Sequence, residues 1–421
     1  MGHGYWMFDW LEDNHLTTQE EVVSLLPKYG VIEDLRLRAE AAATSAGAQV
    51  AAAPSILAGT GIDLTGGHTA CPSPTCMRFQ VDQLFKHVWH YFEKIVVRDA
   101  VTPALLQSAE IPLQHLTETI IVHSAPLLYL REIGAEHLIE FVPKTVCYEH
   151  PDAHAKDAGL EGILEKKQLL IKEICSGSQL FKVEESAGTI TYRLQTAAFA
   201  DNVLMKFGDN FRETPEVIKQ ILVERSFDEY VADLTADITA ARELKMPLGT
   251  IRPLHSKLLA ASSAPSIAEV VFQLDLPILN GLSPKQLIKL RQEEQESFVN
   301  FRNSLKKAVA DRLKTSSETN PHELAEEIRQ DVIEPSLFAI RQRLEVSKKA
   351  LAKKSGVSMF LGAIGATCGL LAGLGPAGAL AAGTAICLAG TSNAASKSLE
   401  ESHQIELDGM YFLWKASEHA S

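Results

Sequence analysis

Two cysteines and two histidines in the stretch GGHTACPSPTCMRFQVDQLFKHVWHYFEKI carry the side chains that bind zinc. Cys71 and Cys76 flank a proline-rich turn, and His87 and His90 follow about one helical turn apart. Two thiolates and two imidazoles are a common ligand set for a structural zinc ion. The histidine spacing is shorter than usual, with His68 as a substitute ligand, so the pattern predicts a zinc site only loosely.

A second group in CYEHPDAH offers Cys147, His150 and His154, of which the two histidines share a face if the segment is helical. The alternative, which the loose spacing in both groups favours, is that these are core cysteines and surface or helix-packing histidines. No cofactor other than zinc is indicated.

Familiar catalytic motifs are missing from the sequence. The run GTGIDLTGG lacks the Gly-Lys-Ser/Thr ending of a phosphate-binding P-loop, so its glycines predict a flexible turn. The chain contains no G-x-S-x-G, H-E-x-x-H or kinase signature. Carboxylate pairs such as Asp228 and Glu229 lie in charged helical faces, where solvation is their ordinary role. We therefore nominate no catalytic residue, and an enzymatic activity is unsupported.

The composition is that of a soluble folded protein. The 421 residues are 46% hydrophobic and 22% charged. A net charge of −13 argues against bulk nucleic-acid binding, which needs a concentrated basic surface. Six scattered cysteines indicate a reducing compartment, and MGHGYWMFDWLEDNH lacks the features of a secretory signal. We expect a cytoplasmic protein.

Several local signals mark the starts of helices. Thr18 with Glu21, and Ser283 with Gln286, have the spacing of a capping box. A capping residue stands directly before proline at Thr214, at Ser283 and at Asn320. Amphipathic helices follow over 284–313 and 321–354, the second with a kink or break expected at Pro335. These signals predict a mostly α fold.

The sequence predicts one pair of β-strands. QLFKVEESAGTITYRLQ alternates apolar and polar residues on both sides of Ala187-Gly188, which predicts a small β-hairpin near 179–195. KIVVRD, at 94–99, fits either a helix end or a strand. The expected organisation begins with an N-terminal helical segment (1–43), a flexible connection (44–67) and a mainly helical region with the β-hairpin (68–210). A helical domain (211–354), an apolar helical hairpin (355–396) and a C-terminal helix (397–421) follow.

The segment from Ser355 to Ser396 has no charged side chain. Pro376 divides it into two arms of roughly 20 residues, each long enough to span a bilayer as a helix. Gly365, Gly369 and Gly373 form a small-residue ridge that permits close helix packing, a glycine zipper. Lysines in front of the segment, Lys353 and Lys354 among them, suit the cytoplasmic side of a membrane or an anionic lipid surface.

The alternative for this segment is a buried Gly/Ala-rich helical hairpin in a soluble domain. The second arm has few strongly apolar residues, and the chain continues into an ordinary helix, LEESHQIELDGMYFLWKASEH. The absence of charge and the flanking lysines favour membrane contact.

The run LDLPILNGLSPKQLIKLRQEEQESFVNFRNSLKKAV precedes a charged helix and the apolar segment. This arrangement resembles the C-terminal halves of uncharacterised bacterial proteins that occur among anti-phage defence genes. The resemblance covers about the last third of the chain and carries over no functional residue. It implies a bacterial cytoplasmic protein with a role in host defence.

These observations give two main functional hypotheses, besides a third in which the cysteines and histidines serve a zinc-dependent enzyme. The first is an anti-phage or toxin-like effector that is soluble at rest and releases its apolar hairpin to the inner membrane, peripherally or by insertion, where copies could assemble. The second is a soluble sensor or adaptor that binds a protein partner and keeps the hairpin as permanent core.

Overall fold

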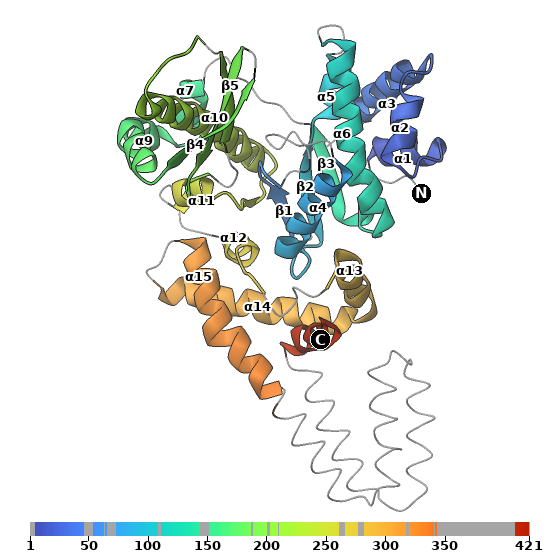
Figure 1. Ribbon diagram of the computed structural model, residues 1–421. Helices are drawn as coiled ribbons and strands as arrows, with labels where there is room; N and C mark the ends of the chain where they lie inside the picture. The colour runs from blue at the N-terminus through green and yellow to red at the C-terminus, as the bar shows by residue number, and fades with distance from the viewer. Residues whose placement is uncertain are drawn as a thin grey trace, which may run out of the picture. The chain divides into compact units, whose positions relative to one another are not determined.

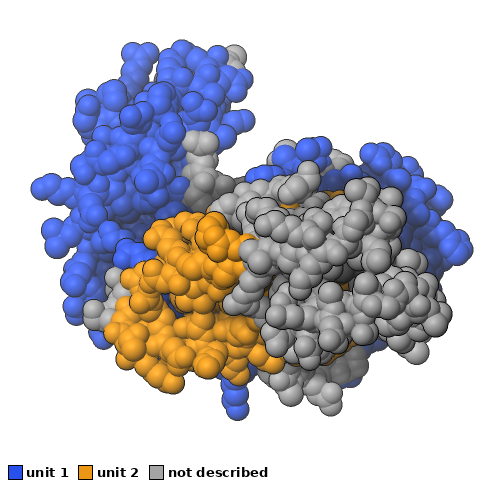
Figure 2. All heavy atoms as spheres, turned by 90° about the horizontal axis from the view of Figure 1, so that it is seen from below, with its two compact units in different colours: residues 1–273, 317–324 blue, residues 274–316, 325–421 orange. Residues whose placement is uncertain are grey.

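The computed structural model divides the chain into two compact units, shown by colour in Figure 2. Unit 1 consists of residues 1–273 and 317–324, and unit 2 of residues 274–316 and 325–421. The mostly helical class is confirmed. The structure describes residues 5–45, 54–62, 64, 73–107, 111–143, 151–186, 188–199, 203–208, 210–260, 266–276, 282–316, 320–340, 342 and 409–420.

A four-stranded parallel sheet lies in unit 1 (Figure 1). Its strands stand in the order β3-β2-β1-β7 and each pairs in parallel with its neighbours. KIVVRD forms one of them, which resolves the choice left open by the sequence. The bounds are β1 Ser55–Ala58, β2 Lys94–Asp99, β3 Ile139–Pro143 and β7 Leu248–Gly249.

Strand β1 corrects the prediction of a flexible connection over 44–67. Ile56, Leu57 and Ala58 are fully buried, and the register pairs Leu57 with Val96 of β2 and with Leu248 of β7. A strand that is covered on both faces has a short continuous apolar run and no alternation, so it lacks the pattern that identifies a surface strand. This stretch is therefore part of the core.

The chain before β1 is helical, and helices also connect β1 to β2 and β2 to β3. Helix α2 begins with the predicted capping box, in which Thr18 and Glu21 bond reciprocally. The bounds are α1 Trp6–Asp13, α2 Gln19–Leu25, α3 Val31–Ser45, α4 Pro74–Val88, α5 Val101–Leu106, α6 Leu113–Glu132 and the short 3₁₀ helix η1 Glu136–Leu138.

The long connection from β3 to β7 contains a second sheet. Strands β4 and β5 pair antiparallel over the range predicted for the β-hairpin, with Gly188 at φ +88 in the turn, and β6 pairs with β5 as a third strand. The remaining elements of this connection are helical. The bounds are α7 Pro151–Asp157, α8 Glu161–Glu165, α9 Lys167–Ser176, β4 Gln179–Ser186, β5 Thr189–Gln195, β6 Val203–Gly208 and α10 Pro215–Glu243.

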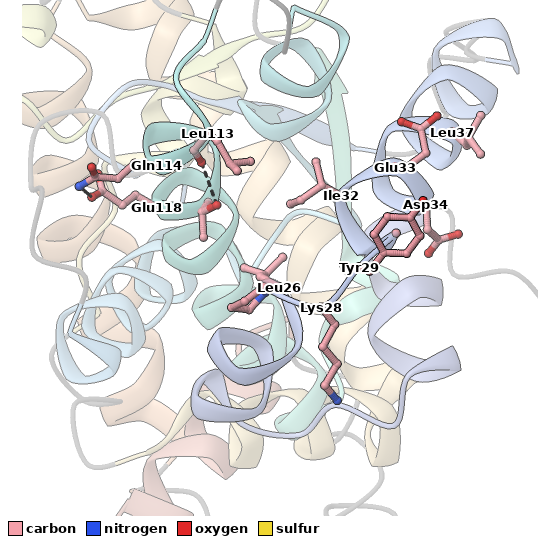
Figure 3. A pocket seen from close by; sticks show the side chains of 13 residues that line it. Leu26, Lys28, Tyr29, Ile32, Glu33, Asp34, Leu37, Leu113, Gln114 and Glu118 are labelled. Atoms are coloured by element: carbon pink, nitrogen blue, oxygen red, sulfur yellow. Dashed lines mark hydrogen bonds between the residues drawn. The ribbon is translucent and has the colours of Figure 1, made fainter.

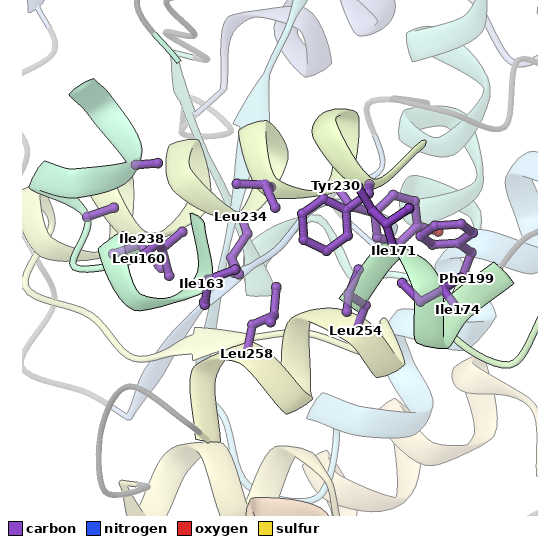
Figure 4. Close-up of a cluster of buried hydrophobic side chains, with 14 of the residues drawn as sticks. Leu160, Ile163, Ile171, Ile174, Phe199, Tyr230, Leu234, Ile238, Leu254 and Leu258 are labelled. Atoms are coloured by element: carbon purple, nitrogen blue, oxygen red, sulfur yellow. The ribbon is translucent and has the colours of Figure 1, made fainter. Parts of the chain in front are cut away.

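Helix α10 runs through a hydrophobic core cluster of unit 1. Thr214 caps its first turn, as predicted, by accepting a hydrogen bond from the backbone N–H of Val217. Figure 4 shows side chains of α8, α9, α10 and α11 (Pro253–Ala260) converging, with Leu234 of α10 near the centre. A short helix, α12 (Ile267–Phe272), follows. Burial of this many apolar side chains fixes α10 firmly in unit 1.

The described part of unit 2 is helical. Ser283 and Gln286 form the predicted capping box at the start of α13. In front of α15, whose first turn belongs to the 317–324 part of unit 1, Asn320 accepts from the backbone N–H of His322. The irregularity expected at Pro335 takes the form of a π-helical turn just before it. The bounds are α13 Pro284–Glu293, α14 Gln295–Thr315, α15 Pro321–Ile328, the π turn Arg329–Ile333 and α20 Tyr411–Ala420.

The C-terminal helix α20 packs on α14. The ring of Phe412 lies 5.2 Å from that of Phe298 and 5.9 Å from that of Phe301 between centroids. The aromatic part of the α14 stripe therefore packs against α20. The predicted hairpin 355–396 lies outside the described residues, and no described helix is both long and apolar enough to cross a membrane.

Candidate functional site at the carboxyl edge of the parallel sheet

Three neighbouring parallel strands end at one edge of the sheet with polar residues. Strand β1 is followed by Gly59-Thr60-Gly61, β2 ends in Arg98-Asp99, and β7 is followed by Thr250 and Arg252. The strand order reverses between β1 and β7, because β2 and β3 lie on one side of β1 and β7 on the other. In open α/β sheets such a reversal is the usual position of a ligand.

The loop after β1 binds a carboxylate of the chain itself, that of Asp237. The backbone N–H of Thr60 donates to Asp237 Oδ2 at 2.8 Å, and the Thr60 hydroxyl donates to Asp237 Oδ1 at 3.0 Å. The Arg98 guanidinium pairs with Asp237 Oδ1 at 2.6 Å and also donates to the Thr60 hydroxyl. All three residues are buried, with exposed fractions of 2% or less. We call these donors, Thr60 and Arg98, the anion nest.

Glycine at position 59 makes this approach possible. Gly59 donates its N–H to the Gly249 carbonyl at 2.8 Å. A Cβ atom on Gly59 would lie 2.8 Å from that same oxygen and 3.1 Å from Asp237 Oδ2. Real Cβ atoms essentially never come as close as the first of these distances, and the second is unusually tight, so a larger residue would push the two loops and the carboxylate apart.

A second buried ion pair adjoins the nest from the loop after β7. Arg252 donates to Asp233 at 2.8 Å, and its guanidinium lies 4.3 Å from the ring centre of Tyr230. Its Nε atom is 3.1 Å from the place that a Cβ on Gly61 would take, and Gly61 has φ +105. Arg252 thus packs directly on the β1 loop and supports its conformation.

His255 at the start of α11 stays neutral. Its Nε2–H donates to the backbone carbonyl of Tyr230 at 2.9 Å. Burial, with a smaller effect of the nearby Arg252 charge, lowers the pKa of His255 to about 3. A cationic imidazole is therefore not available here at neutral pH, and the positive charges of this edge come from Arg98 and Arg252.

Helix α10 supplies the acceptors of both ion pairs. Tyr230, Asp233 and Asp237 follow each other at three and four residues, so they share one helix face. Asp237 reaches the loop after β1, while Asp233 reaches the loop after β7. One rigid helix therefore holds two strand-end loops in place.

The end of β2 carries a further buried polar contact. Asp99 Oδ1 accepts from the Tyr5 hydroxyl at 2.8 Å and from the backbone N–H of Val101 at 2.8 Å. The Tyr5 ring stacks on Phe141 of β3 at 4.0 Å, and its hydroxyl lies 3.1 Å from His123 Nε2. Burial and the Asp99 charge raise the pKa of Tyr5 well above its usual value. The N-terminal segment is thereby tied to the sheet edge.

The structure describes only some of the residues predicted to bind zinc. Cys76 is half-buried on α4, whereas Cys71 lies outside the described residues, as do Cys147 and His150. His87 Nδ1 donates to the Phe272 carbonyl at 3.0 Å, and His90 Nε2 to that of Val271 at 3.1 Å. Within the described ranges no three candidate ligands come together for a metal ion. The four-ligand zinc site stays a prediction.

The residues predicted to take part in helix packing and membrane contact also lie outside the part of the chain that the structure describes. They are Gly365, Gly369, Gly373, Pro376, Lys353 and Lys354.

A groove of about 1020 Å³ lies between α3 and the start of α6 (Figure 3). Exposed apolar side chains, Tyr29, Leu37 and Leu113, line it. Its carboxylates Glu33 and Asp34 are paired with arginines on the next turn of α3. The groove shares no residue with the carboxyl edge, and its polar groups do not converge on a ligand position.

A comparison with protein families, curated proteins and solved structures finds no match to this chain. The functional argument therefore rests on the geometry of the carboxyl edge and on the sequence.

Proposed function

We propose that unit 1 binds a nucleotide through its phosphate groups at the carboxyl edge of the parallel sheet, next to the β1 loop. The observation that carries this proposal is the anion nest of Thr60 and Arg98 at the β1–β7 strand-order reversal. Phosphates bind at such positions because glycine-rich loops bring backbone N–H groups close to them.

The loop differs from the full dinucleotide fingerprint in one respect. In the pattern G-x-G-x-x-G, Gly59 and Gly61 take the first two places, but Leu64 takes the third. Leu64 is buried and has φ +59, a conformation that costs free energy for a leucine. Strained residues cluster at ligand sites, so this feature supports a binding loop with altered packing rather than an ordinary turn.

Isothermal titration of the full chain with adenosine and guanosine phosphates and with NAD⁺ tests the proposal. The matched variants are Gly61→Ala and Gly134→Ala, because both glycines have positive φ but only Gly61 lies at the site. We expect Gly61→Ala to weaken nucleotide binding at least tenfold and Gly134→Ala to leave it unchanged. Absence of binding at millimolar nucleotide in the wild-type chain would falsify the proposal.

The second proposed function is the membrane action of the 355–396 segment. Its support is the uncharged sequence, the lysines before it, and the resemblance to proteins of anti-phage loci. The packing of Phe412 on Phe298 and Phe301 also supports it, because this contact covers part of the apolar stripe of α14 without the 355–396 segment.

Liposome flotation with and without nucleotide tests this second function, with a deletion of 355–396 as the control. We expect the full chain to float with anionic vesicles and the deletion variant to remain in the aqueous fraction. A full chain that never floats, under any nucleotide, supports the alternative of a sensor or adaptor with the segment as permanent core.

A further inference from the structure

We propose that Asp237 is an internal stand-in for the ligand phosphate, so that ligand binding at the anion nest requires displacement of this carboxylate. The inference rests on the proposed nucleotide function and adds the regulation of that same site. An anion site that is filled by the protein's own carboxylate is closed until the carboxylate leaves it.

The donors and the acceptor of the nest come from different parts of the fold. Thr60 and Arg98 belong to the ends of β1 and β2, whereas Asp237 reaches them from α10. The donors of these bonds therefore come from the strand ends, and their acceptor comes from α10. A backbone N–H, a hydroxyl and a guanidinium bind phosphate oxygens as they bind carboxylate oxygens.

The Asp237 carboxylate balances a buried positive charge at the nest. Two guanidinium groups, Arg98 and Arg252, face two carboxylates, Asp237 and Asp233, and His255 is neutral. Removal of the Asp237 carboxylate deprives the buried Arg98 guanidinium of this ion pair. A buried charge of this kind strongly favours the uptake of a replacement anion.

Truncation of Asp237 would open space for a small anion. Gly59 and Gly61 contribute no side chains, and Asp237 Oδ2 comes within 3.1 Å of the place of a Cβ on Gly59. Truncation of Asp237 to alanine vacates the volume of one carboxylate group, which formate fills directly. Phosphate is larger and needs, in addition, a small outward shift of the loop.

The experiment is chemical rescue of Asp237→Ala in the full chain. Thermal unfolding is followed with increasing formate or orthophosphate at constant ionic strength, with sodium chloride as the balancing salt. Leu234→Ala is the matched control, because it truncates a buried side chain one turn away on α10 without touching a charge. We expect saturable restoration of thermal stability of Asp237→Ala by both anions and none for Leu234→Ala.

The same variant should bind adenosine diphosphate at least tenfold more tightly than the wild type, because the internal competitor is gone. Asp237→Asn should show little rescue, since its amide still fills the space. If Asp237→Ala does not fold in chloride, refolding yield with and without formate and orthophosphate becomes the readout.

The possible outcomes separate the two proposals. Rescue by formate without orthophosphate identifies a socket for carboxylate alone and overturns the stand-in role, as does equal behaviour of Asp237→Ala and Leu234→Ala. Wild-type nucleotide titration judges the proposed function independently, since that function fails if the wild-type chain does not bind millimolar nucleotide, whatever the rescue of Asp237→Ala shows.

Discussion

Gly409 lies directly against Ser304 of helix α14, so that a Cβ atom on Gly409 would collide with the Ser304 hydroxyl and lie 2.6 Å from its Cβ. Gly409 is the residue at which the described chain resumes before α20. The close approach brings Phe412 onto Phe298 and Phe301. Docking of the C-terminal helix thus depends on the absence of a side chain at one position.

Gly409→Ala should undock α20 from α14. Overpacking of this kind costs about 1–3 kcal/mol, which corresponds to a fall of roughly 5- to 150-fold in the hydrogen-exchange protection of α20. Hydrogen exchange followed by mass spectrometry on peptides covering 411–420 measures it. Ser304→Gly removes the opposing side chain, so the double variant should regain protection despite the helix-propensity cost of glycine, about 1 kcal/mol. An undiminished protection in Gly409→Ala contradicts the proposed steric fit.

The ion pair between Lys415 and Glu294 should respond asymmetrically to mutation. The Lys415 side chain is 9% exposed and that of Glu294 22% exposed. Glu294→Gln leaves the more buried charge without its partner and should cost about 1–3 kcal/mol of unfolding free energy, whereas Lys415→Met leaves the more exposed charge and should cost less. Urea denaturation of both variants and of the double variant measures the order. A larger loss in Lys415→Met would contradict the burial argument.

The low pKa of His255 predicts a stability that falls with acid. The unfolded histidine takes up a proton near pH 6.5 and the folded one only near the value of about 3, so protonation favours the unfolded state between these two values. Between pH 7 and pH 5.5 this linkage removes about 1 kcal/mol. His255→Gln should lose this part of the pH dependence, while the part due to other groups remains. Parallel urea titrations at several pH values measure both, and between pH 7 and pH 5.5 the wild type should lose about 1 kcal/mol more stability than His255→Gln.

Local signals allowed the helix starts to be predicted, whereas the parallel sheet needed information from distant residues. Thr18, Ser283 and Thr214 cap helices through bonds to residues three positions away, which a sequence displays directly. Strand β7 has two residues and β1 four, and each is a strand only because of its neighbours. A pattern of residues in one short window cannot reveal such pairing.

The anion nest was missed for a related reason. Thr60, Arg98 and Asp237 lie far apart in the sequence, so no spacing connects them. The one local signal is the Gly-Thr-Gly that follows the apolar run Ile56-Leu57-Ala58. Taken as a buried strand followed by a glycine turn, it predicts a loop at the carboxyl edge of a sheet. The same glycines, taken alone, predict only a flexible turn.

The hydrogen bond from Tyr5 to Asp99 should contribute more to stability than a chemically identical bond elsewhere in unit 1. Tyr129 also donates to a carboxylate, that of Asp82, at 2.9 Å, but this pair is only part-buried. Tyr5→Phe keeps the ring on Phe141 and removes only the hydroxyl, which leaves Asp99 with one donor fewer in a buried site. We expect a loss of about 1.5–3 kcal/mol, because bonds to buried charged groups are the costly ones to lose.

Tyr129→Phe is the matched control and should cost less than about 1 kcal/mol, since water can replace its hydroxyl at a part-exposed carboxylate. Urea denaturation at neutral pH compares the two variants, and both phenols are protonated there because their pKa values are raised, that of Tyr129 to about 12. Hydrogen exchange of α1 provides a second readout. Tyr5→Phe should increase exchange in α1 selectively, because the hydroxyl ties this helix to the end of β2. Equal losses in both variants, with α1 exchange unchanged, would show that the N-terminal segment is held by ring packing alone.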